Sequence, residues 1–298
     1  MWETLTNHLE VLYGAALALV IVVLLTPAVG GMARMLGVVD RPGMRRLNRS
    51  PVPRLGGLAL FFGIFVPALA FLPLGRETKG LLLGAAVATL VGAIDDFRGL
   101  VWWEKLGGQI AAAAIPTGFG IWVQNFTFPL VGVHELPGWV GVPLTILWIV
   151  AIMNMVNFLD GLDGLAAGVC GISGFTFCLI ALSLGRPEPA ILAAIVFGAC
   201  LGFLRHNFYP ARIFMGDSGA LLLGFTLGAL AVQGLLKTAD ANSPSVSTAT
   251  IVTSLGIFVV LYLGLLVVDF VLMRRYAKVD PPELGGHGDE FALPAVSY

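Results

Sequence analysis

The chain has 298 residues and a formal net charge of −1; 57% of its residues are hydrophobic and only 12% are charged. Soluble globular proteins average about 25% charged residues, so this composition excludes a water-soluble domain, a disordered chain and a nucleic-acid-binding protein. It predicts an all-α, polytopic integral membrane protein that forms a single membrane-embedded domain over residues 1–298.

Nine apolar stretches are candidates for transmembrane helices, which need about 20 mostly apolar residues to cross a bilayer. The third and seventh are the shortest, and the first lacks the basic flank of a cleaved signal peptide. The nine predicted spans are 11–33, 55–74, 80–94, 106–123, 138–156, 165–184, 189–204, 218–236 and 249–273. After the fourth span, the outer loop Gln124–Pro137 alternates weakly and contains a glycine, which favours a small β-hairpin.

The basic residues between these spans predict the orientation of the chain. Counting the loops alternately places 13 of the 17 Lys and Arg residues on one side of the membrane. The positive-inside rule makes that side cytoplasmic. We therefore expect a multi-pass protein of the inner (plasma) membrane with its N-terminus outside and a cytoplasmic C-terminal tail, residues 274–298.

Five aspartates lie at the ends of predicted spans, all on the predicted cytoplasmic side. Carboxylates that gather at one site need protons or a cation, and oxygen ligands suit Mg²⁺ or Mn²⁺ rather than zinc. With the nearby arginines as phosphate partners, this pattern is typical of a phosphoryl-transfer site on the cytoplasmic face. The five are Asp95, Asp96, Asp160, Asp163 and Asp217.

Each of these motifs also has a purely structural interpretation. Asp95 and Asp96 are what a solvated helix end can carry, although the helix dipole disfavours anions at that end. Asp217 can cap the eighth span, a role that is compatible with metal binding. The arginine-rich loop 34–57 is either a positive-inside signal, a contact for anionic lipid headgroups or a phosphate site. The N-x-x-N-x-x-D-G-x-D-G motif at 154–164 favours function, because chance does not readily place it beside apolar spans.

Segments spread over most of the chain resemble the polyprenyl-phosphate N-acetylhexosaminyl-1-phosphate transferases. This family includes the undecaprenyl-phosphate N-acetylglucosaminyl-1-phosphate transferases and the phospho-N-acetylmuramoyl-pentapeptide transferase. The resemblance implies transfer of a sugar 1-phosphate from a UDP-HexNAc to polyprenyl (undecaprenyl) phosphate, with release of UMP and dependence on Mg²⁺ or Mn²⁺. The matching segments, in family order, are RPGMRRLNRSPVPRLGGLAL (41–60), VGAIDDFRGL (91–100), Lys105 with Gln109, NMVNFLDGLDGLAAGV (154–169) and RIFMGDSGALLLGF (212–225).

The resemblance also implies roles for individual residues. Asp217 resembles the principal metal ligand, and Asp95 resembles the acid near the lipid phosphate, with Asp96 beside it. Asp160 and Asp163 complete the expected catalytic cluster. The residues expected to bind the substrates are Arg54, Lys105, Asn154, Asn157, Asn207 and Arg212.

Two local features bear on which member of the family this chain resembles. Pro-Arg-Leu-Gly-Gly at 53–57 resembles the N-acetylglucosaminyl branch and favours UDP-GlcNAc as donor, with phospho-N-acetylmuramoyl-pentapeptide transferase activity as the alternative. The family's His-x-His-His motif has no counterpart in residues 274–298, so we expect a truncated or divergent tail. An inactive scaffold or binding protein is therefore a second alternative. A secondary transporter is disfavoured because the acids lie at one membrane edge and not at the midplane.

For the reaction we expect direct in-line attack by the lipid phosphate, with double displacement through an aspartyl intermediate as the alternative. The small-residue stretches Gly14–Ala18 and Ala111–Ala114 permit close helix packing. Such packing can occur within one chain or between two copies, so a homodimer stays open.

Overall fold

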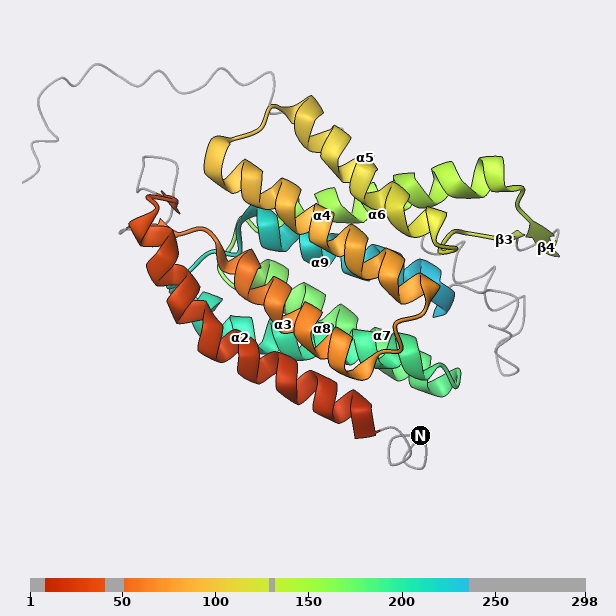
Figure 1. Ribbon diagram of the computed structural model, residues 1–298, viewed down its shortest axis with the longest axis horizontal. Helices are drawn as coiled ribbons and strands as arrows, with labels where there is room; N and C mark the ends of the chain where they lie inside the picture. The colour runs from red at the N-terminus through yellow and green to blue at the C-terminus, as the bar shows by residue number, and fades with distance from the viewer. Residues whose placement is uncertain (1–8, 41–50, 129–131, 236–298) are drawn as a thin grey trace, which may run out of the picture. The chain divides into compact units, whose positions relative to one another are not determined.

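The computed structural model describes residues 9–40, 51–128 and 132–235, and the statements below concern these residues. They form a bundle of α-helices with two short pairs of antiparallel strands (Figure 1). The helices are α2 (Leu9–Met35), α3 (Gly56–Phe71), α4 (Arg76–Arg98), α5 (Trp102–Gly118), α6 (Gly138–Leu159), α7 (Leu165–Ser183), α8 (Pro187–Asn207), α9 (Gly216–Leu230) and the π-helical turn η1 (Ala231–Leu235).

The helical, polytopic class predicted from the sequence is confirmed. Each of the first eight predicted spans overlaps one of the helices α2 to α9. Five of the described helices are long and apolar enough to cross a membrane, namely α2, α4, α6, α7 and α8, and α3 is a shorter apolar helix. The ninth predicted span, 249–273, and the tail 274–298 lie outside the described residues. The count of nine spans and the orientation of the chain therefore stay predictions.

Two pairs of short strands lie between the helices. Strands β3 (Asn125–Phe128) and β4 (Gly132–Glu135) pair antiparallel, which confirms the predicted hairpin in the loop after α5. Strands β1 (Val39–Asp40) and β2 (Val52–Pro53) also pair antiparallel and bring the start of α3 back to the end of α2. The sequence did not predict this second pair, because two-residue strands are too short to show alternation.

Helix α9 lies inside the bundle, against α3, α4 and α6 (Figure 1). Every residue of α9 except Asp217 is buried. A helix that is apolar on all faces is stable only when other helices surround it, and here α9 has no polar stripe. Asp217 is therefore held by the best-enclosed helix of the described bundle.

Close approach of α3 and α4 to α9 requires glycine at two positions. A Cβ atom at Gly57 of α3 would collide with the backbone nitrogen of Gly219, and one at Gly92 of α4 would collide with the carbonyl oxygen of Asp217. The first residues of α3 are also hydrogen-bonded to the segment before α9. The amides of Gly56 and Gly57 donate to the carbonyl oxygens of Phe214 and Met215, at 3.0 and 2.8 Å. These contacts fix the first turn of α9 against its neighbours.

We expect Gly57→Ala to destabilise the protein by about 1–3 kcal/mol, the usual penalty for overpacking a well-packed interface. The added methyl group meets backbone atoms, which cannot move aside as a flexible side chain could. The matched control is Gly31→Ala in α2, where a Cβ meets nothing within 4 Å. Thermal unfolding in detergent should show a lower midpoint for Gly57→Ala and an unchanged or higher one for Gly31→Ala. Equal midpoints in the two variants would contradict the close α3–α9 contact.

Candidate active site

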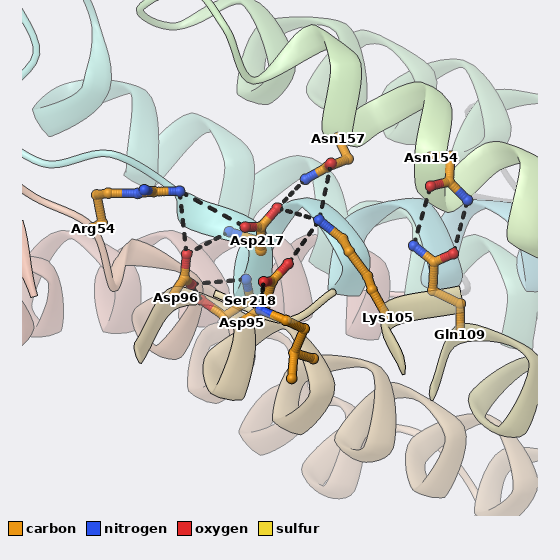
Figure 2. Close-up of polar contacts among 10 residues, drawn as sticks. Arg54, Asp95, Asp96, Lys105, Gln109, Asn154, Asn157, Asp217 and Ser218 are labelled. Carbon is orange, nitrogen blue, oxygen red and sulfur yellow. Dashed lines mark hydrogen bonds and ion pairs between the residues drawn. The ribbon is translucent and has the colours of Figure 1, made fainter. Parts of the chain in front are cut away.

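The ends of several helices meet at one end of the bundle and bring together side chains that are far apart in the sequence. The last turns of α4 and α6 meet the first turns of α5 and α9, with the residue two positions before α3 beside them. Figure 2 shows the resulting cluster of charged and amide side chains. It contains Arg54, Asp95, Asp96, Lys105, Asn157 and Asp217, all of which the sequence analysis had singled out.

Lys105 is the centre of this cluster. Its Nζ lies 2.8 Å from Asp95 Oδ2 and 2.8 Å from Asp217 Oδ1, and it donates a hydrogen bond to Asn157 Oδ1 at 3.2 Å. Asn157 Nδ2 in turn donates to Asp217 Oδ1. One ammonium group therefore holds two mostly buried carboxylates close together, although like charges would otherwise repel each other.

Arg54 lies on the other side of Asp217 and is the more open of the two cations. Its guanidinium is 3.7 Å from Asp217 Oδ2, 3.8 Å from Asp96 Oδ1 and 3.9 Å from Asp40 Oδ1. These separations are those of ion pairs and are longer than hydrogen bonds. The side chain of Arg54 is 36% exposed, against 19% for Lys105. Arg54 therefore presents donors toward solvent at the edge of the cluster, as a phosphate-binding arginine does.

Asp96 is turned away from Lys105 and into the start of α9. Its Oδ1 accepts a hydrogen bond from the backbone nitrogen of Asp217 at 2.9 Å. Its Oδ2 accepts from the backbone nitrogen and the hydroxyl of Ser218, at 3.0 and 2.8 Å. The residue at the N-cap position of α9 is Met215, and Asp217 lies in the first turn. The structural alternative in which Asp217 itself caps the eighth span is therefore wrong, because Asp96 provides the cap.

Asn154 lies deeper in the bundle and pairs with Gln109. The two amides exchange hydrogen bonds, Gln109 Nε2 to Asn154 Oδ1 at 3.2 Å and Asn154 Nδ2 to Gln109 Oε1 at 2.8 Å (Figure 2). Asn154 Nδ2 also donates to the carbonyl oxygen of Val150. Lys105 and Gln109 are four residues apart on α5, so this pair fixes the helix face that carries Lys105 against α6. Asn154 therefore contacts Gln109 and the backbone of its own helix, one layer away from the cluster.

Asp163 and Asn207 lie beside the cluster and hold the loops around it. Asp163 Oδ2 accepts a hydrogen bond from the backbone nitrogen of Ala211 at 2.9 Å. Asn207 accepts from the backbone nitrogen of Gly164 and donates to the carbonyl oxygen of Ile213, at 3.1 and 2.9 Å. Asn207 is only 2% exposed, so its amide stabilises the two loops and is not presented to a ligand in this structure.

Asp160 and Arg212 are the remaining residues that the sequence analysis had singled out. Asp160 ends α6 and is half-buried. Burial raises the pKa of Asp160 to about 8, and the nearby charges of Asp217 and Asp96 add to the effect. The side chain of Arg212 is exposed, on the loop that precedes α9. Both residues lie at the same end of the bundle as the cluster.

Oxygen donors for a divalent cation are present, although they do not form a complete protein cage. In the described part of the chain, no three His, Cys, Asp or Glu side chains are grouped so that they could hold a metal ion. Asp217 and Asn157 do present a carboxylate and an amide side by side. Mg²⁺ usually takes one or two carboxylates and completes its shell with water and substrate phosphates. The residues present therefore fit a magnesium ion that a phosphorylated substrate completes.

Two residues of the site were not among the predicted functional residues. Gln109 was noted only as part of a matching segment, although its position four residues after Lys105 on one helix face was a usable signal. Ser218 was not singled out, and its bond to Asp96 joins residues 122 positions apart. No local pattern could have revealed that contact.

The fold and the site together define a multi-pass membrane protein with a charged site at one end of its helices. The sequence profile of glycosyl transferase family 4 matches residues 78–235, the stretch that contains all five aspartates. The chain belongs to glycosyl transferase family 4. A profile of cytochrome bd terminal oxidase subunit I matches residues 229–281, most of which lie outside the described residues, and includes none of the site residues.

The chain is similar to named proteins of two kinds, N-acetylglucosamine-phosphate transferases and a phospho-N-acetylmuramoyl-pentapeptide-transferase. A "probable undecaprenyl-phosphate N-acetylglucosaminyl 1-phosphate transferase" of Bacillus subtilis is 34% identical over 268 residues, 89% of this chain and 71% of the relative. The decaprenyl-phosphate N-acetylglucosaminephosphotransferase of Mycobacterium leprae is 37% identical over 231 residues, 71% of this chain and 58% of the relative. The phospho-N-acetylmuramoyl-pentapeptide-transferase of Moorella thermoacetica is 34% identical over 244 residues, 76% of each chain.

Proposed function

We propose that this protein transfers N-acetylglucosamine 1-phosphate from UDP-GlcNAc to a polyprenyl phosphate, giving polyprenyl-diphosphate-GlcNAc and UMP. The observation that carries this proposal is the cluster in which Lys105 joins Asp95 to Asp217 beside Arg54, at one end of a bundle of apolar helices. Such a site suits a reaction between a water-soluble nucleotide sugar and a phosphate fixed in the membrane. Family membership and the names of the Bacillus and mycobacterial relatives support the same reaction.

The positions of the charged groups suggest how the chain would bind both substrates. Arg54, at the open edge, would bind a phosphate of the nucleotide sugar, and Lys105 would donate to phosphate oxygens from the inner side. Asp217 and Asn157 would hold Mg²⁺, with Mn²⁺ as a substitute. When bound, the ion supplies positive charge that neutralises the diphosphate. Asp217 contacts both cationic side chains directly, so these two cations hold its carboxylate in place.

The chemical step is an in-line displacement. An oxygen of the lipid phosphate forms a bond to the β-phosphorus, the bond from that phosphorus to the oxygen bridging to the α-phosphorus breaks, and UMP leaves with the electron pair. A phosphate monoester has a second pKa near 6 and is mostly dianionic at pH 7. Asp95 therefore has only the remaining proton to accept, and positioning with charge neutralisation provides most of the catalysis. A phosphosugar that stays covalently bound to the protein would contradict direct attack.

The site would face the cytoplasm, at the inner leaflet of the plasma membrane. The isoprenoid tail cannot leave the bilayer, because each exposed CH₂ group costs about 0.8 kcal/mol. The acceptor phosphate must therefore meet the nucleotide sugar at the membrane surface, where the helix ends gather their charges. The whole chain is proposed to act as one membrane-embedded transferase domain, either as a monomer or as a homodimer.

A second candidate activity is phospho-N-acetylmuramoyl-pentapeptide transfer, which the name of the Moorella relative favours. The two activities share the acceptor and the leaving group and differ in the sugar. A comparison of donors therefore separates them, whereas a comparison of metals or lipids does not.

The full-length protein, purified in detergent, should release UMP when UDP-GlcNAc, undecaprenyl phosphate and Mg²⁺ are all present. Omission of the lipid should abolish UMP release, because the acceptor is the nucleophile. UDP-N-acetylmuramoyl-pentapeptide, tested in parallel, should give a much lower rate than UDP-GlcNAc. Faster release from the pentapeptide donor would favour the second candidate. No UMP from any UDP-HexNAc, in a folded sample, would favour a scaffold or binding role.

A further inference from the structure

Asp96 differs from its neighbour Asp95 in what its carboxylate contacts. The side chain of Asp96 has no exposed surface, and both of its oxygens accept hydrogen bonds from the first turn of α9. Asp95, one residue earlier in α4, instead contacts Lys105 and accepts a hydrogen bond from the backbone nitrogen of Leu100. Of these two adjacent acids, Asp95 therefore contacts α5 and Asp96 contacts α9.

The first turn of α9 needs an acceptor from outside its own segment. The first backbone N–H groups of a helix have no partner within the helix. An N-cap side chain normally supplies one, but the residue at that position is Met215, and it makes no capping hydrogen bond. Asp96 supplies the acceptor from α4, and its negative charge is favourable at the positive end of a helix.

Gly216 makes room for this contact. A Cβ atom at Gly216 would lie 2.6 Å from Asp96 Oδ2, and the residue has a φ of +72°, in the left-handed region that favours glycine. The close approach of Asp96 to α9 is therefore built into the sequence of both segments. Because Asp96 binds the amide nitrogens of Asp217 and Ser218 themselves, it fixes the backbone from which the Asp217 side chain projects toward Lys105 and Arg54 (Figure 2).

We propose that Asp96 is a positioning residue that caps α9 from α4 and aims Asp217 at its cationic partners, and that it does not touch substrate. Its effect on turnover rests on the proposed function, whereas its effect on the backbone of α9 does not. The test therefore measures both turnover and the protection of the α9 backbone. It compares Asp96→Ala, which removes both acceptor oxygens, with Asp96→Asn, which keeps one acceptor oxygen and replaces the other with an NH2 donor.

Hydrogen exchange of the full-length protein in detergent, followed by mass spectrometry over residues 214–222, reads the cap directly. We expect Asp96→Ala to lose protection in this segment, Asp96→Asn to keep part of it through its one remaining acceptor oxygen, and Ser218→Ala to lose part of it. Asp95→Asn is the matched control, since Asp95 contacts Lys105 and not the α9 backbone. Its exchange over residues 214–222 should equal that of the unmodified protein.

UMP release reads the consequence for the site. A misplacement of about 1 Å can reduce turnover by about 100-fold, so we expect a loss of that size in Asp96→Ala. Asp96→Asn should lose less turnover than Asp96→Ala, because it keeps one of the two acceptor oxygens that hold the first turn of α9. In a plot of kcat/KM against pH, the acid limb of Asp96→Asn should lie at the same pH as that of the unmodified protein. A positioning residue does not exchange a proton with substrate.

Two results would overturn the proposal. One is a loss of turnover in Asp96→Asn as complete as in Asp96→Ala with unchanged exchange in both, which would make Asp96 a chemical participant. The other is unchanged protection over residues 214–222 in Asp96→Ala, whether or not the protein releases UMP. If the unmodified protein releases no UMP, the proposed function fails. The hydrogen-exchange result still shows whether Asp96 caps α9. If Asp96→Ala does not fold, Asp96→Asn and Ser218→Ala still provide both readouts, and unaltered protection in Ser218→Ala counts against the cap.

Discussion

Asp217→Asn should reduce UMP release by about 1,000-fold or more. A neutral amide at this position removes the charge that Lys105 and Arg54 face and leaves a poor ligand for a divalent cation. Losing one preorganised electrostatic partner of a transition state typically reduces turnover by about 100- to 1,000-fold, and here the cation would be lost as well. Initial rates of UMP release at saturating UDP-GlcNAc measure the effect.

The control for this substitution is Glu188→Gln, the same carboxylate-to-amide change at the opposite end of the bundle. Glu188 lies exposed in the first turn of α8, far along the chain from the helix ends that form the cluster. It should leave both the rate and the unfolding midpoint unchanged. Asp217→Asn should keep a midpoint close to that of the unmodified protein, because the backbone contacts of α9 stay in place. A near-normal rate in Asp217→Asn would remove the metal role from the proposal.

Lys105→Met should abolish activity and also destabilise the protein, unlike Asp217→Asn. Without the ammonium group, Asp95 and Asp217 face each other across a mostly buried space with no cation between them. Removing one partner of a buried ion pair leaves an uncompensated charge, so we expect a loss of about 3 kcal/mol in the free energy of unfolding. Thermal unfolding in detergent measures this loss, and UMP release measures the activity.

A second substitution separates the two effects of Lys105→Met. Adding Asp95→Asn removes one of the two unpaired carboxylates, so the double variant should recover part of the lost stability while its activity stays absent. Lys79→Met removes the same charge from an exposed position in the first turn of α4 and should change neither property. If the double variant is less stable than Lys105→Met, the repulsion between Asp95 and Asp217 does not explain the loss.

Much of the fold was predictable because hydrophobic length is a strong local signal. All eight predicted spans that fall on described residues correspond to helices, and the β3–β4 hairpin was predicted from weak alternation and one glycine. The helix ends were less predictable. Helix α4 continues past the predicted 80–94 to Arg98, because its last turn is closed by Gly99 in the left-handed region and carries the two adjacent acids.

The candidate site was predictable as a set of residues but not as a set of roles. Alternating helices must place the aspartates at one end of the bundle, so their convergence follows from the spans. The difference between Asp95 and Asp96 could not be predicted, since it depends on which helix each side chain faces in three dimensions. For the same reason, the sequence could not show that the buried amide of Asn207 joins two loops of the chain, and its binding of substrate stays a prediction.

The enclosure of α9 also restricts the route by which a lipid can approach Asp217. Hydrocarbon tails run along surfaces that face the bilayer, and α9 offers no such surface, because every one of its residues except Asp217 is covered. The head group of a membrane-anchored acceptor must therefore reach Asp217 past the ends of the neighbouring helices, while its tail stays outside the bundle. Tail length would then influence anchoring in the bilayer, and head-group chemistry alone would decide entry.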